Sequence, residues 1–143
     1  MEVQQMGNTE KKAPGKKKIA IFVVIGIVVV ALAVGGYFLN TLVTYRKNVA
    51  AIQIKNADLT AIRDGEYFGE SDVGLVSAKV RVVVENHKIS VIELIEHNNG
   101  RGVPAEVIPD RIIEEQRIDV DAVSGATASS NVIRAAVYNA LAG

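Results

Sequence analysis

The sequence predicts an α+β fold: a small antiparallel sheet with two helices packed on it, preceded by one N-terminal transmembrane helix. Residues 19–39 form an uninterrupted apolar run. Between residues 75 and 97, β-branched residues alternate with polar ones in two runs, as in half-buried strands. Residues 104–116 and 130–143 have helical composition. These three observations indicate one modest domain behind a membrane segment.

Composition excludes several classes of function. The 143-residue chain has no Cys, which rules out disulfides, thiolate metal sites and thiol catalysis. Its two histidines, His87 and His97, are too few for a conventional histidine metal cluster. Residues 40–143 carry eleven Lys or Arg against fourteen Asp or Glu, a balance of −3. We therefore expect no nucleic acid among the partners, because nucleic-acid binders present a basic face.

Residues 19–39 predict a membrane anchor. As a helix, this run would be about 31 Å long, close to the thickness of the hydrocarbon core of a bilayer. Residues 1–18 carry five Lys, whereas only Arg46 and Lys47 follow the run closely. The positive-inside rule then predicts a single-pass protein of the cell membrane. In this arrangement residues 1–18 form a basic tail in the cytoplasm, residues 19–39 contact lipid, and the rest of the chain is extracytoplasmic.

A signal peptide is the alternative reading of the same segment. Ala31-Leu32-Ala33 resembles a small-residue cleavage site, which would release the body after Ala33. The apolar run continues through Leu39, and the polar region before it is long. Both features favour an uncleaved anchor. Beyond it, Leu42, Tyr45, Val49 and Ile52 recur at helical spacing, which predicts a stalk helix or linker over 40–56.

The remaining residues, 57–143, form the predicted extracytoplasmic domain. A turn at Asp64-Gly65 precedes a short strand, and the two later strands are joined at Asn86-His87-Lys88 as a hairpin. A helix is expected to open near Pro109, because Pro fits the first turn of a helix. The last helix is expected from Ser130, with an apolar face formed by Val132, Ile133, Ala136, Val137, Ala140 and Leu141.

The stretch DAVSGATASS, residues 121–130, gathers small residues where a strand or loop enters the last helix. A helix N-terminus offers unpaired N–H groups and favours anions such as phosphate. Gly125 permits an unusual backbone conformation, and Ala126 leaves space beside it. A plain tight turn, with Ser129 or Ser130 as the N-cap, explains the same letters.

The stretch also resembles the flavinylation motif of FMN-binding domains, which occur in the C subunit of sodium-pumping NADH:quinone oxidoreductase and the G subunit of Rnf complexes. Residues 64–141 are similar to small members of that family. The motif matches Asp121, Ser124, Gly125, Ala126, Thr127 and, as the acceptor, Ser129. Many members have Thr at the acceptor position, where this chain has Ser.

The resemblance implies FMN covalently attached through a phosphodiester to Ser129, installed by an FMN transferase that uses FAD as donor. It implies an electron-transfer flavoprotein more than a stand-alone catalyst, with membrane redox proteins as partners. Asp121 is expected to serve recognition by the transferase, and His97 and Arg101 to border the flavin. Ser130 is the neighbouring hydroxyl. Two alternatives remain: a flavin-free surface interaction module, and a flavin reductase with non-covalent FMN.

Overall fold

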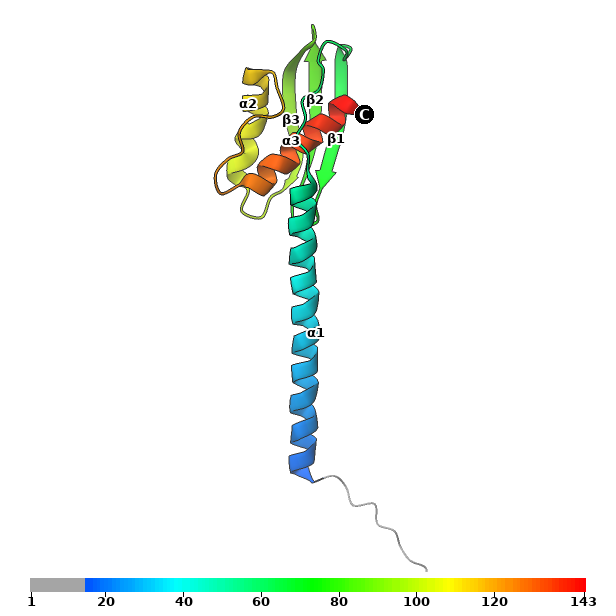
Figure 1. Cartoon of the computed structure of the whole chain (residues 1–143), viewed down its shortest axis with the longest axis vertical. Helices are drawn as coiled ribbons and strands as arrows, with labels where there is room; N and C mark the ends of the chain where they lie inside the picture. Colours follow the sequence, from blue (N-terminus) through cyan, green and yellow to red (C-terminus); the bar gives the residue numbers. More distant parts are fainter. Residues whose placement is uncertain (1–14) are drawn as a thin grey trace, which may run out of the picture. The chain divides into compact units, whose positions relative to one another are not determined.

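The computed structural model describes residues 15–143 and divides into two compact units. The first unit ends at Thr41, and the second comprises Leu42–Gly143. Most of the expected basic tail, residues 1–14, lies outside the described residues. The elements follow in the order α1, β1, β2, β3, η1, α2 and α3 along the chain (Figure 1).

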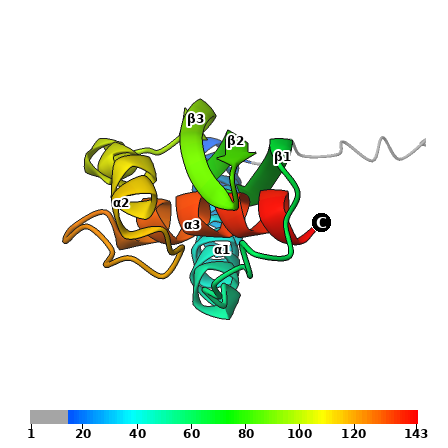
Figure 2. The ribbon, with the colours of Figure 1, turned by 90° about the horizontal axis from the view of Figure 1, so that it is seen from above.

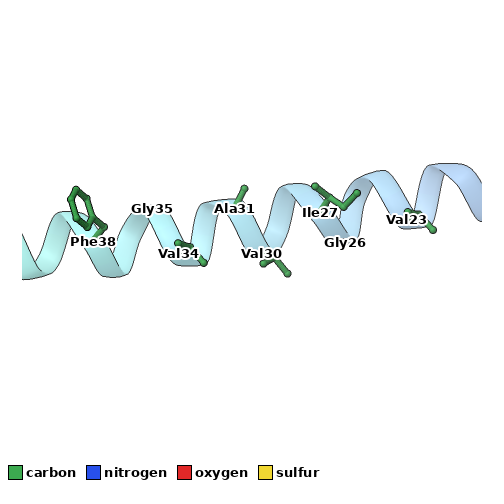
Figure 3. A pocket seen from close by; sticks show the side chains of 8 residues that line it. All are labelled: Val23, Gly26, Ile27, Val30, Ala31, Val34, Gly35 and Phe38. Atoms are coloured by element: carbon green, nitrogen blue, oxygen red, sulfur yellow. The ribbon is translucent and has the colours of Figure 1, made fainter.

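Helix α1 (Lys16–Ala51) contains the apolar run and is long and apolar enough to cross a membrane. Its best 18-residue window has a mean hydropathy of 3.0, and none of that window is buried. A signal sequence near the N-terminus can satisfy the same criteria of length and composition. One side of the helix forms an open groove of apolar side chains and glycines (Figure 3); its residues are Val23, Gly26, Ile27, Val30, Ala31, Val34, Gly35 and Phe38.

The second unit contains the predicted antiparallel sheet. Its strands are β1 (Gly65–Asp72), β2 (Ser77–Glu85) and β3 (Lys88–Asn98), in the order β1-β2-β3. Strands β2 and β3 form the expected hairpin. Asn86 and His87 both have positive φ, 52° and 58°. Two such residues in a row give the type I′ turn, whose twist matches that of a hairpin.

Two helices pack on the sheet, as predicted. Helix α3 (Thr127–Ala142) contacts β1 and β2, and α2 (Ile108–Glu115) contacts β3 (Figures 1 and 2). The expected alternation holds on β2, where Val80, Val82 and Val84 are fully buried. All six residues of the predicted apolar face of the last helix are buried as well: Val132, Ile133, Ala136, Val137, Ala140 and Leu141.

The edge of β3 is closed by a side chain. The amide of Gln116, which follows α2, accepts a hydrogen bond from the N–H of Ile89 and donates one to its C=O, both at 2.9 Å. The side chain thus imitates a neighbouring strand at this residue. Gln116 itself has left-handed backbone geometry, with φ of 51°, and ends α2.

The structure corrects one helix boundary and adds a short helix. Helix α3 begins at Thr127, three residues before the expected Ser130, because the preceding turn closes at Ala126. A short 3₁₀ helix, η1 (Val103–Val107), with a Pro at its start, precedes α2, which begins at Ile108, next to the expected Pro109. Near the anchor, α1 ends at Ala51.

The predicted stalk packs against the core of the second unit. Tyr45, Val49, Ile52 and Ile54 are partly buried against the core that the sheet and α3 form. Residues that follow the helix are also held by hydrogen bonds, since Oδ1 of Asn56 accepts from the N–H groups of Ile118 and Asp119. The compact unit that starts at Leu42 therefore includes these residues.

Candidate functional site

The site is built around the N-terminus of α3. Gly125 has a φ of 80°, which a residue with a β-carbon rarely adopts, and it turns the chain toward the helix. The N–H of Ala126 donates to the C=O of Val123 at 3.0 Å and closes this turn. No side-chain hydrogen bond caps α3, and its first turn contains no acidic residue. The first N–H groups of such a helix favour an anion.

The hydroxyl groups of the motif lie in different environments. Ser124 and Thr127 are exposed, whereas Ser129 is 2% exposed and Ser130 is fully buried. Oγ of Ser130 accepts from the N–H of Val123 at 3.0 Å and donates to the C=O of Ala126 at 2.9 Å. Ser130 therefore ties the turn to the helix from inside the first turn, and does not act as the N-cap.

A cavity of about 140 Å³ opens beside these hydroxyls. The motif and the loop after β3 form its walls, with two further residues from α1 and the segment before β2. The lining residues are Tyr45, Val76, Asn99, Arg101, Gly102, Gly125, Ala126, Thr127, Ala128 and Ser129. Gly102 is essential to this shape, because a β-carbon there would overlap the side chain of Ser129.

The loop after β3 is held by a cluster of polar side chains. Nδ1 of His97 lies 3.1 Å from Oε1 of Glu106, and the amide nitrogen of Asn99 lies 3.4 Å from the same oxygen. The C=O of Asn99 accepts from the N–H of Gly102 at 2.7 Å. The His97 side chain is 4% exposed, and Nε2 has no partner among the described residues. The cluster therefore fixes Asn99 at the cavity wall.

Two arginines hold the chain that enters the motif. Arg134 of α3 donates to the C=O of Val120, and Arg111 of α2 donates to the C=O of Asp121 at 3.2 Å. Burial lowers the pKa of the Arg134 guanidinium, although an arginine remains charged at neutral pH. Since both bonds use backbone oxygens, the carboxylate of Asp121 stays at the exposed start of the motif.

The predicted site residues are only partly brought together. Gly125, Ala126, Thr127, Ser129 and Arg101 line the cavity. The residues outside its lining are Asp121, Ser124, Ser130 and His97, of which His97 lies behind Asn99. Sequence reasoning missed Tyr45, Asn99, Gly102 and Glu106. The glycines of residues 97–102 were the available signal for Gly102, whereas nothing in the pattern of α1 distinguished Tyr45.

The residues present fit the phosphate end of a flavin nucleotide. Thr127, the first residue of α3, places an exposed hydroxyl at the uncapped N-terminus of the helix. Arg101 supplies a positive charge at the cavity. Gly102 leaves free the space that a β-carbon would fill. Enclosed ligand sites usually have volumes of about 300–1,000 Å³. A cavity of about 140 Å³ therefore suits the phosphate and adjoining atoms and leaves the ring system outside.

Comparison with known proteins agrees with this arrangement. The family model of the FMN-binding domain matches residues 75–142, which include β2, β3, η1, α2 and all of α3. No curated protein matches the chain. The matched residues contain nine of the ten that line the cavity, all except Tyr45. Residues 75–142 therefore match the FMN-binding domain family, and this match supports a flavin-binding protein with FMN as its cofactor.

Proposed function

We propose that this protein is an electron-transfer flavoprotein that holds FMN through a covalent phosphodiester at the N-terminus of α3. The observation that carries the proposal is an exposed hydroxyl, Thr127, at an uncapped helix N-terminus within a matched FMN-binding domain. A phosphodiester keeps one negative charge, which the helix N-terminus and Arg101 stabilise. When bound, the flavin supplies the redox chemistry, and the chain supplies its tether, orientation and electrostatics.

The small cavity favours a covalent tether. Non-covalent cofactors are usually held by burying most of their surface in a larger site. Here a cavity of about 140 Å³ would leave much of FMN uncovered. A covalent bond keeps such a cofactor in place even when its ring remains exposed. The same exposure gives a redox partner access to the ring without the opening of a lid.

Burial of the motif's hydroxyls favours Thr127 as the attachment point. The resemblance implied Ser129, but that side chain is 2% exposed and lies against Gly102. A modifying enzyme would have to open the contact between α3 and the loop to reach it. Thr127, two residues earlier, is exposed. In the proposed modification it attacks the flavin-side phosphorus of FAD, AMP leaves, and a base of the transferase accepts the hydroxyl proton.

Asp121 supports recognition by such a transferase. Asp121 is exposed, and Arg111 donates a hydrogen bond to its C=O. The carboxylate is therefore held near the motif and remains accessible to a partner protein. The buried Ser130 and the half-buried Arg134 define the shape of the turn rather than its reactivity. The recognised surface is therefore formed by the exposed residues of this segment, Asp121, Ser124, Gly125 and Thr127.

The proposed location is the outer face of a cell membrane, with residues 19–39 as the anchor. Support comes from the length and hydropathy of α1 and from the excess of Lys before it. Tethering by a covalent bond suits this location, because a dissociated flavin would be lost outside the cell. Partners are then membrane redox proteins that donate electrons to the flavin or accept them from it.

The decisive experiment is the mass of the full-length protein, purified in detergent after co-expression with an FMN transferase. Covalent attachment adds the mass of FMN less one water and gives a fluorescent band on a denaturing gel. Expression without the transferase is the control. An unmodified mass with FMN that dialyses away after denaturation would instead support a reductase with non-covalent FMN. A protein without any flavin would favour the interaction module.

A further inference from the structure

We infer that Tyr45, in the last turns of α1, contacts the flavin ring, so that the segment next to the anchor forms part of the cofactor site. This inference rests on the proposed function, because it requires FMN at the cavity beside Thr127. The family match begins at residue 75 and does not include Tyr45. Tyr45 would therefore be a cofactor-contacting residue that this chain adds to the matched domain.

The position of Tyr45 is fixed by packing. Its side chain lines the cavity together with Val76 and the residues of the motif. Val49, on the same face of the helix, and Ile52, directly after its end, are partly buried against the core of the unit. These contacts hold the end of α1 on the domain, and Tyr45 belongs to the compact unit that starts at Leu42.

The other aromatic residues of this unit lie elsewhere. The unit contains Tyr45, Tyr67, Phe68 and Tyr138. Tyr67 and Tyr138 pack against the core, and the hydroxyl of Tyr67 donates to the C=O of Arg63 at 2.8 Å. Phe68 is 63% exposed and lies opposite Arg81, in the row of the sheet that holds the ion pair of Arg81 with Glu93. Tyr45 is thus the one aromatic side chain at the cavity among residues 42–143.

The size of the cavity gives this aromatic residue a role. A flavin attached at Thr127 places its phosphate in the cavity, and its ring must then lie against the surface around the opening. Flat aromatic systems gain about 0.5–1.5 kcal/mol from contact with one another beyond the area that they bury. Tyr45 offers such a surface, whereas Val76 and the glycines and alanines of the site do not.

Flavin fluorescence tests the contact, because a phenol or indole ring in contact with a flavin quenches its emission and an aliphatic side chain does not. The full-length protein carrying covalent FMN is compared with Tyr45→Leu, and covalent loading is normalised by mass. We expect a several-fold rise in fluorescence lifetime and yield in Tyr45→Leu. Tyr45→Trp should restore quenching, which a purely structural role for residue 45 would not produce.

Tyr37→Leu is the matched control. Tyr37 lies on the same helix, is 77% exposed and is absent from the cavity lining, so its replacement should leave the emission unchanged. Equal emission from the wild type and Tyr45→Leu at equal loading would overturn the inference. If the wild type carries no covalent FMN, the proposed covalent attachment is wrong. The emission of free FMN added to the wild type and to Tyr45→Leu then tests the contact by itself. Equal quenching by the two proteins would overturn the inference about Tyr45.

Discussion

Gly102 and Ser129 fit against each other so closely that a β-carbon at position 102 would overlap Oγ and approach Cβ of Ser129. The contact joins the loop after β3 to the first turn of α3, and both residues line the cavity. Any side chain at position 102 must therefore displace the loop or the helix. The shape of the proposed phosphate site depends on this single pair.

Gly102→Ala should destabilise the domain by about 1–3 kcal/mol, as overpacking usually does. It should also lower the yield of covalent flavin, because the cavity wall must move. Urea unfolding of the full-length protein in detergent measures the first effect, and mass measures the second. In a Ser129→Gly background the cost of Gly102→Ala should shrink. Equal costs in both backgrounds would show that the two residues do not interact.

Thr127→Ala should abolish covalent flavin, and Thr127→Ser should retain it, because only the hydroxyl is required. Ser129→Ala should remain flavinylated. Ser130→Ala should remain flavinylated too, but lose about 1–2 kcal/mol of stability with its two buried hydrogen bonds. Peptide mapping and in-gel fluorescence provide the readout. Loss of flavin in Ser129→Ala together with its retention in Thr127→Ala would assign the acceptor to Ser129.

Acid should weaken the β2–β3 hairpin through Asp64. Hydrogen bonds from the backbone N–H groups of Asn86 and His87 hold the pKa of the Asp64 carboxyl below its ordinary value of 3.8. A lowered folded-state pKa means that the stabilisation is present above the unfolded-state pKa and is lost as pH falls through the folded-state pKa. The urea midpoint should therefore fall in acid. Asp64→Asn, which cannot titrate, should show a flatter pH profile, and identical profiles would contradict this.

Gln116→Glu should destabilise the edge of β3 by about 1–3 kcal/mol at neutral pH. The amide nitrogen now donates to the C=O groups of Ile89 and Ile113, and a carboxylate would face both oxygens without a proton to offer. The fold would raise the pKa of that new carboxyl. The destabilisation should then be small at pH values below the pKa of this carboxyl in the unfolded state. It should grow as the pH rises through the pKa of the carboxyl in the folded state. Glu114→Gln, on the exposed side of α2, is the control.

Protease added to intact cells should remove the flavin domain, because residues 42–143 are expected outside. The excess of Lys before the apolar run predicts this orientation. Protection of the domain in intact cells, with digestion only after lysis, would reverse the assignment. Release of the whole domain without protease would instead indicate cleavage after Ala33.

The alternation of Val80, Val82 and Val84 was sufficient to predict β2, because burial on one face of a strand has a period of two residues. The final helix was predicted by its apolar spacing, but its start was not. Gly125 and the bonds of Ser130 set that start, and both depend on contacts with Val123 and Ala126 rather than on periodicity.

The candidate site shows the same division. Residues Gly125 to Thr127 of the motif line the cavity together because they are contiguous in sequence. Asn99 and Glu106 could not be predicted, because they act through a bond that forms only when η1 folds over the loop. The choice between Thr127 and Ser129 as the attachment point rests on their different exposure. That difference arises only once the helix has formed and Gly102 packs against Ser129, so the sequence does not reveal it.

The compact unit starts at Leu42, and only Asn40 and Thr41 lie between it and the end of the apolar run at Leu39. With residues 19–39 in a bilayer as proposed, so short a connection keeps the domain tethered to the membrane. Its search for a redox partner in the same membrane then takes place in two dimensions. Confinement to the membrane raises the effective concentration of the redox partner around the flavin domain. Weak contacts between the two proteins are then sufficient for rapid electron exchange.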